Sequence, residues 1–169
     1  MKLITAPNEF LDQKVKPFDF DNNDVVKISG EMANLMMKEN GIGLSANQVG
    51  LDASIFVMRP LNSKDVTKPF AVIDPIIREV SEQTELGQEG CLSFPNLVLS
   101  VRRPVELVAQ FLDIDGKECI LKFEGIDARC FLHEYDHLQG ITFDKRVSKL
   151  KLDIAKKKKM KYEKRIVNG

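Results

Sequence analysis

Two histidines stand four residues apart in the segment His133-Glu134-Tyr135-Asp136-His137, and they are the only histidines in the chain. On a helix, side chains at this spacing project from one face, so both imidazoles can bind a single metal ion. Glu134 follows the first histidine directly, where it can reach a water molecule on that ion and act as general acid and base. The spacing therefore predicts a catalytic metal site rather than an ordinary helix with polar side chains.

The third ligand of the predicted site is expected upstream of the histidines. Catalytic sites of this type use three protein ligands and leave the next position to water. No histidine follows His137, and the remaining segment is short and basic. Cys91 is the best candidate, because it lies in an expected loop at residues 88–93 in which Gly90 permits an unusual backbone bend.

The other two cysteines leave more than one interpretation open. Three cysteines in all are an odd and sparse set, which argues against a disulfide framework and for a reducing compartment. Cys119 falls in an expected strand. Cys130 lies one turn before His133, where it either lines the pocket or is a small buried apolar residue. Asp136 either supports a ligand or faces solvent, and we expect a structural role for it.

A glycine-rich segment, Gly41-Ile42-Gly43-Leu44-Ser45-Ala46-Asn47-Gln48, lies further upstream. A dinucleotide-binding fingerprint of similar appearance requires a strand before it and a helix after it. Here a helix is expected before the segment and a strand after it, which disfavours that interpretation. The segment is better explained as a loop that brings its backbone and the amide of Gln48 close to a substrate.

Hydrophobic periodicity predicts the elements that position these segments. Apolar residues recur with helical spacing over residues 24–39, and Asn40-Gly41 marks the end of that helix. Asp115-Gly116 is a tight-turn signal that predicts a hairpin. Strands are expected at residues 53–58, 70–73 (ended by Pro75), 97–101, 105–112 and 118–123.

The metal-binding segment is expected on a helix of its own. Ile126, Cys130, His133 and His137 are spaced four, three and four residues apart, and Gly140 is a plausible left-handed cap. A basic helix is expected from residue 148 to about residue 165. The order predicts an α+β fold, with antiparallel or mixed strands around a central metal-binding helix, an N-terminal helix and a C-terminal helix.

Length and charge bound the remaining possibilities. A chain of 169 residues suits one domain, and we expect residues 1–147 to form the catalytic part and residues 148–169 a basic helix of the same domain. The segment from residue 145 onward has 11 Lys and Arg against two acids, which leaves 14 bases and 23 acids before it. The basic segment meets an acidic partner or RNA, or is simply a solvated helix face.

Targeting signals are not apparent in the sequence. No apolar run approaches the roughly 20 residues that span a bilayer, and the N-terminus lacks the apolar core of a secretory signal. We therefore expect a cytoplasmic protein without a membrane partner, and a monomer.

Taken together, three segments resemble the peptide deformylase family. That family has a glycine-rich segment ending in Gln, then Glu-Gly-Cys-Leu-Ser, then His-Glu-x-x-Asp-His. This chain has residues 41–48, residues 89–93 and residues 133–137 in the same order. The resemblance spans nearly the whole chain and implies removal of the formyl group from the initiator methionine of nascent chains. It implies one divalent ion, Fe²⁺ above all, with Zn²⁺, Ni²⁺ or Co²⁺ able to replace it.

The resemblance also implies residue roles. Glu134 would take a proton from water and return it to the leaving amine, while the Gln48 amide and the Leu92 backbone N–H would stabilise the oxyanion. Ile42, Ile126 and Cys130 would receive the methionine side chain. Gly43 would bond the peptide backbone, and the basic C-terminal helix would contact ribosomal RNA. The substrates that the resemblance implies are N-formylmethionyl peptides.

Some positions depart from the family's usual residues. Leu132 stands where Gln is usual, so a hydrogen bond that supports a ligand is missing there. Ser45 and Asn47 replace the commoner Ala and Pro or Thr. Val98 lies near the position where some members have an Arg that touches the substrate, which would alter affinity or sequence preference.

Two other functions remain open from sequence. A peptidase would use the same ligands to cut an internal amide, although a glycine-backed formyl pocket leaves no room for a chain on the acyl side. A non-catalytic binding module would instead use the basic segment to dock on a ribosome or nucleic acid.

Overall fold

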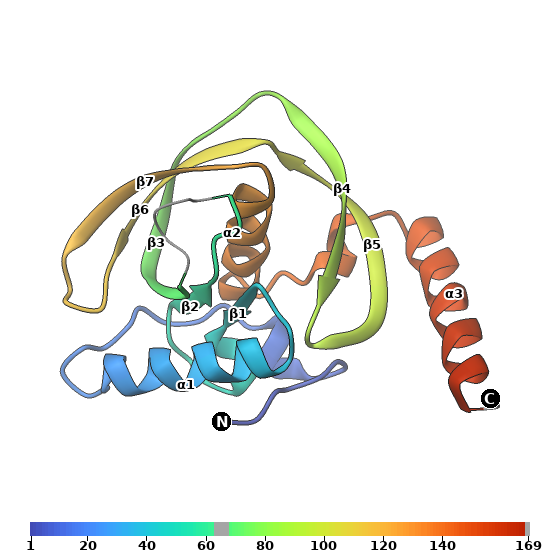
Figure 1. The fold of residues 1–169 in the computed structure, drawn as a ribbon, viewed down its shortest axis with the longest axis horizontal. Helices are drawn as coiled ribbons and strands as arrows, with labels where there is room; N and C mark the ends of the chain where they lie inside the picture. Colours follow the sequence, from blue (N-terminus) through green and yellow to red (C-terminus); the bar gives the residue numbers. More distant parts are fainter. Residues whose placement is uncertain (63–67, 168–169) are drawn as a thin grey trace.

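The computed structural model describes residues 1–62 and 68–167, which form two antiparallel sheets and three α-helices (Figure 1). The strands are β1 (Gly43–Ser45), β2 (Ile55–Met58), β3 (Phe70–Val80), β4 (Thr84–Cys91), β5 (Phe94–Pro104), β6 (Glu106–Leu112) and β7 (Glu118–Glu124). The helices are α1 (Val25–Lys38), α2 (Gly125–Leu138) and α3 (Lys149–Val167), with 3₁₀ turns at Glu9–Asp12, Ala46–Val49 and Phe143–Arg146. This arrangement confirms the predicted α+β class.

The two sheets enclose the central helix. Five strands pair in the order β1-β2-β3-β6-β7, and β4 pairs with β5 as a separate hairpin. Helix α2 lies between them and contacts strands of both sheets, while α1 packs against β1, β2 and β3 (Figure 1). The predicted hairpin at Asp115-Gly116 is present as β6–β7, and Gly116 has a positive φ of 73°.

Helices α1 and α2 form where the apolar spacing predicts them. Asp24 caps α1 by accepting a hydrogen bond from the backbone N–H of Lys27 at 3.0 Å. Met32 and Met36, on one face of α1, are fully buried against the sheet. Phe131 of α2 is also fully buried, in a separate cluster of apolar side chains. Burial of such a side chain contributes roughly 1.5–3 kcal/mol, so these stripes fix both helices against the strands.

The predicted end of one strand is wrong. The strand expected to end at Pro75 continues to Val80. Asp74 has a positive φ of 47°, and the register with β6 shifts between Ile73 and Ile76. The proline therefore lies in a bulge, where its missing N–H leaves no ladder partner unsatisfied.

The segments expected as loops are more regular than predicted. Cys91 does not lie in a loop but ends β4, a strand that the sequence pattern does not predict, and Gly90 does not have a left-handed backbone. The register does shift between Gly90 and Cys91. The glycine-rich segment contains strand β1 and a 3₁₀ turn, closed by Gly50 at a φ of 79°.

Helix α3 packs against the β4–β5 hairpin. Leu152 and Ala155 contact the cluster that contains the buried Leu97 and Leu99 of β5. The Asn96 amide also donates a hydrogen bond to Glu163 at 3.2 Å. Within residues 1–62 and 68–167, no helix is both long enough and apolar enough to cross a membrane.

Candidate metal centre and active site

Helix α2 and strand β4 bring three soft and borderline donors together. The ligand atoms of Cys91, His133 and His137 all lie within 4.8 Å of one another. Cys91 Sγ is 3.2 Å from His137 Nε2. Bonds of about 2.0–2.1 Å to nitrogen and about 2.3 Å to sulfur, at a tetrahedral angle, place the two atoms about 3.5 Å apart. The donor set and its spacing therefore fit one divalent ion.

His133 is oriented for ligation by a buried carboxylate. Glu89 Oε2 lies 3.0 Å from His133 Nδ1, which leaves Nε2 to face the ion. Burial alone would lower the pKa of His133, but its contacts with Cys91 and Glu89 raise that pKa to about 10. Ligation needs the unprotonated ring, so a bound ion would take the place of this proton.

A buried network of ion pairs holds Glu89 in place. Arg103 donates two hydrogen bonds to its carboxylate, at 2.9 and 3.0 Å, and a third to Asp136 at 2.5 Å. Arg129 also bonds Glu89, and Arg146 bonds Asp136. Burial raises the pKa of Glu89, but hydrogen bonds with His133 and Arg103 outweigh it and hold the pKa at about 2. Glu89 is therefore ionised and fixed in place.

His137 is held in the neutral form. Burial and the charge of His133 lower its pKa well below the ordinary value, which suits a metal ligand because ligation needs the unprotonated imidazole. Asn47 donates a hydrogen bond from its side chain to the His137 backbone carbonyl at 2.6 Å. The replacement at position 47 therefore has a partner on the metal-binding helix.

Glu134 is buried beside the three donors, at 4% exposure. Ser45 Oγ donates a hydrogen bond to Glu134 Oε2 at 2.5 Å. Burial raises the pKa of Glu134, and the charge of His133 and the Ser45 hydrogen bond offset only part of that rise. A Cβ atom at Gly43 would overlap the carboxyl group of Glu134, so only glycine allows β1 to pass this close.

Cys91 and His133 line a cavity of about 520 Å³, whereas His137 is fully buried behind them. The residues that the sequence assigns to catalysis or substrate binding also line it, namely Ile42, Gly43, Gln48, Leu92, Ile126, Cys130 and Glu134. Gln48 is fixed by its own segment, because its Oε1 accepts a hydrogen bond from the Ser45 N–H at 2.8 Å. Its Nε2 consequently faces Ser93 Oγ at 3.1 Å and Cys91 Sγ at 3.5 Å.

Cys130 and Leu132 are both buried on helix α2. Cys130 lines the cavity at 6% exposure, with its thiol 3.4 Å from the Ile42 carbonyl, and burial raises its thiol pKa well above the ordinary value. Leu132 is 8% exposed and packs in the apolar cluster around Phe131. Where the family usually has Gln, this chain thus has an apolar side chain that packs in the core.

Sequence reasoning missed the network that holds the site. The sequence motif alone assigns Glu89 no role, although Glu89 stands two residues before Cys91 and alternation in a strand places both on one side. No local signal marks Arg103, which reaches the site only because β5 pairs with β4. Asp136 was expected to be structural, and it is buried in ion pairs with Arg103 and Arg146.

Comparisons with known proteins agree with this geometry. The sequence model of the family described as polypeptide deformylase matches residues 1–153. The peptide deformylase of Pelagibacter ubique (strain HTCC1062) is 35% identical over 156 residues, which cover 92% of this chain and 91% of that protein. The peptide deformylase of Maricaulis maris (strain MCS10) is also 35% identical, over 96% of this chain and 94% of the other.

Solved structures share the fold as well. The crystal structure of peptide deformylase from Ehrlichia chaffeensis has a TM-score of 0.86 at 34% identity, over 99% of this chain and 98% of that one. A peptide deformylase from Synechococcus elongatus, crystallised in complex with actinonin, has a TM-score of 0.87 at 32% identity, over 94% of this chain and 87% of that one.

The fold and the donor set together define a metal-binding hydrolase. More specifically, the chain belongs to the polypeptide deformylase family, as the resemblance of the three motifs indicated. Its activity is the hydrolytic removal of the N-formyl group from nascent polypeptides.

Proposed function

We propose that Cys91, His133 and His137 bind one divalent ion and that Glu134 acts as general acid and base in deformylation. The observation that carries the proposal is the clustering of the three donor atoms within 4.8 Å, with Glu134 lining the same cavity. Substitution of Glu134 by Gln tests it, because the isosteric amide cannot take a proton while the three ligands stay intact.

Fe²⁺ is the native ion in this proposal, and Zn²⁺, Ni²⁺ or Co²⁺ can replace it. Two imidazoles and a thiolate are ligands that several of these ions accept. When bound, the ion would lower the pKa of a water molecule and polarise the formyl carbonyl. Metal analysis of protein purified without oxygen tests the identity, and loss of activity in air is the result expected for Fe²⁺.

Glu134 moves the proton. Burial moves the pKa of its carboxyl group upward, towards the pH at which the enzyme works. A group with such a pKa both accepts and returns a proton efficiently. It takes a proton from the attacking water and delivers it to the leaving amine. Ser45, through its hydrogen bond to Oε2, keeps the carboxylate turned towards the cavity during this transfer.

Gln48 and Leu92 stabilise the oxyanion that forms on the formyl oxygen. The Gln48 amide is suited to this role because Ser45 fixes its Oε1 and leaves Nε2 directed at the Cys91 side of the cavity. Leu92 follows Cys91 directly and lines the same cavity, so its backbone N–H is the second donor. Donors fixed before the reaction stabilise developing charge without further reorganisation.

The methionine side chain lies against Ile42, Ile126 and Cys130 in our assignment, because these residues line the same cavity as Cys91 and His133. Gly43 bonds the peptide backbone of the substrate, and N-formylmethionyl peptides are the substrates. A Cβ at Gly43 would overlap Glu134, so β1 lies directly against this carboxyl group. We infer that this close approach leaves little space on the acyl side of the scissile bond.

This lack of space separates a deformylase from a peptidase. The purified protein should release formate from formyl-Met-Ala-Ser and leave the unformylated peptide Met-Ala-Ser intact. Cleavage of unformylated peptides without formate release would contradict the proposal. A binding module without catalysis is tested in the same assay, because it would release no formate at all.

Three further features belong to the proposal. Residues 1–147 form the catalytic part and residues 148–169 a basic helix of the same domain. The basic C-terminal helix α3 contacts ribosomal RNA. The protein acts in the cytoplasm as a monomer. Ribosome binding that weakens as salt rises, and that is lost on deletion of residues 149–169, is the expected result.

A further inference from the structure

A second groove adjoins the active-site cavity and lies between the β4–β5 hairpin and α3. Its volume is about 460 Å³, within the range of about 300–1,000 Å³ that is typical of ligand pockets. The groove and the active-site cavity share Gln88, Asn96 and Val98 in their linings. The two cavities therefore adjoin at these three residues, and a substrate that leaves the active site along β5 would reach the groove there.

The hairpin supplies one side of the groove. Val98 pairs with Gly90, the neighbour of the metal ligand Cys91, and Ser100 pairs with Gln88. Alternate residues of a strand face the same side, and Ser100 lies about 7 Å beyond Val98 at the usual rise of a strand. An extended peptide thus needs only about two more residues to pass from the rim of the active site into the groove.

Helix α3 supplies the other side, and its charge is positive. Lys151, Lys158 and Lys159 line the groove together with the apolar Ile154 and Tyr162. Lys159 is paired with Glu163 at 3.7 Å. Lys151 and Lys158 are exposed, and neither has a carboxylate within 4.0 Å among the residues that the structure describes.

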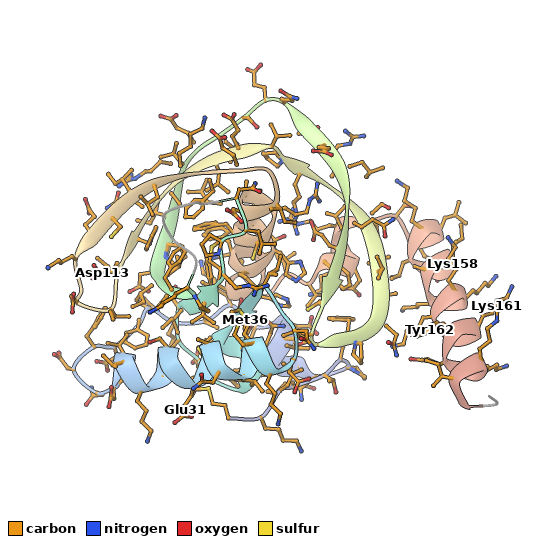
Figure 2. The ribbon with its side chains drawn as sticks, in the orientation of Figure 1. Glu31, Met36, Asp113, Lys158, Lys161 and Tyr162 are labelled. Atoms are coloured by element: carbon orange, nitrogen blue, oxygen red, sulfur yellow. The ribbon has the colours of Figure 1, made fainter. Side chains whose placement is uncertain are left out.

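The basic surface of α3 therefore has two separate parts. Lys151 and Lys158 face the groove, whereas Lys161 projects from the side of the helix turned away from β5 (Figure 2). Lys156 and Lys157 are exposed as well and do not line the groove. The groove-facing lysines are the ones placed to meet a peptide that extends out of the active site.

We propose that this groove binds the part of the substrate that follows its third residue and that it favours acidic side chains there, through Lys151 and Lys158. The proposal rests on the deformylase function and adds a preference at the same site. Exposed ion pairs contribute modestly, so an acidic extension should raise kcat/KM by about three- to tenfold at low salt. The gain should shrink as salt screens the charges.

The test compares formyl hexapeptides that share Met-Ala-Ser and continue with Asp-Glu-Asp, Asn-Gln-Asn or Lys-Lys-Lys. Formate release gives kcat/KM for each hexapeptide and for formyl-Met-Ala-Ser. The acidic hexapeptide should be the best substrate at low salt. The double variant Lys151→Glu/Lys158→Glu should lose this preference and favour the basic hexapeptide, with unchanged kinetics on the tripeptide.

The matched control is Lys156→Glu/Lys157→Glu, which makes the same change of charge on the same helix outside the groove. It should keep the acidic preference.

Two results would overturn the proposal: equal kcat/KM for the three hexapeptides, or the same loss of preference in both double variants. Activity on formyl-Met-Ala-Ser would still support the deformylase function in either case. The proposal would also be overturned if neither double variant changed kcat/KM for the hexapeptides while Lys151→Glu/Lys158→Glu bound RNA more weakly. That result would show that the groove binds RNA instead. An enzyme inactive on formyl-Met-Ala-Ser would overturn the function itself.

Discussion

The metal centre and the groove beside α3 both depend on charged side chains, but the charges are arranged in opposite ways. Glu89, Arg103 and Asp136 are each at most 5% exposed and bind one another. The groove lysines Lys151 and Lys158 are exposed and have no carboxylate partner among the described residues. A buried charge that loses its partner is costly, whereas an exposed pair contributes about 0–1 kcal/mol. The buried ion pairs therefore hold the metal centre in a fixed geometry, whereas the exposed lysines give the groove only a modest preference for acidic side chains.

The largest effect is expected from Glu134→Gln at the metal centre. General acid and base catalysis typically contributes about 10²–10⁴-fold, so kcat on formyl-Met-Ala-Ser should fall by at least two orders of magnitude. The metal content should stay at the wild-type level, because the three ligands are unchanged. A variant that retains its metal and more than a tenth of the wild-type kcat would refute the role of Glu134.

Removal of the carboxylate under His133 should damage both stability and metal binding. Glu89→Ala leaves Arg103 partly unpaired in the interior, which costs about 3–5 kcal/mol in the free energy of unfolding. Loss of the His133 contact should weaken metal affinity by about 10–100-fold. Urea unfolding and metal titration measure the two effects.

Glu85→Ala is the matched control for that variant. Glu85 lies on the same strand but is exposed, so its removal should change stability by no more than about 0.5 kcal/mol. If Glu85→Ala and Glu89→Ala lost equal stability, the distinction between buried and exposed charge would not hold here.

The pH dependence of activity should report the burial of Glu134. Because burial raises its pKa above the ordinary value of 4.5, the carboxylate and the activity are present above that raised pKa and are lost as the pH falls through it. Ser45→Ala removes a hydrogen bond that lowers the pKa. Its acid limb of kcat/KM should therefore move to higher pH than in the wild type, and a shift to lower pH would contradict this account.

The smallest effect is expected where α3 meets the hairpin. Glu163→Ala removes the hydrogen bond with Asn96 and the ion pair with Lys159, both on the surface. Surface pairs of this kind contribute about 0.2–1 kcal/mol, so the urea midpoint should barely change. A loss as large as that of Glu89→Ala would mean that α3 supports the catalytic centre rather than lying beside it.

The sequence predicts the elements whose causes are local. The i and i+4 spacing of His133 and His137 identifies α2, and the apolar stripe from Val25 to Met36 identifies α1, because periodicity alone decides which face is buried. Asp115-Gly116 predicts a hairpin because a tight turn needs a residue that adopts positive φ, as Gly116 does. The three motifs also indicate the family, which the comparisons confirm.

The remaining features depend on contacts between distant segments. Strand β4 has no clear alternation and is stabilised by its pairing with β5. Pro75 argues against a long β3 until the bulge that accommodates it is known. The ion pairs of Arg103 need β4, β5 and α2 in place at once, so no pattern near Arg103 in the chain could predict them.

The central claim is that Cys91 is the third ligand of one catalytic ion, and metal analysis of Cys91→Ser tests it most directly. Cys119→Ser is the control, because this cysteine lies on β7 outside the donor cluster. After purification without oxygen, we expect about one divalent ion per chain in the wild type and in Cys119→Ser, with formate release in both. Cys91→Ser should lose most of its metal and its activity. A Cys91→Ser protein that keeps one ion per chain and wild-type turnover would contradict the account.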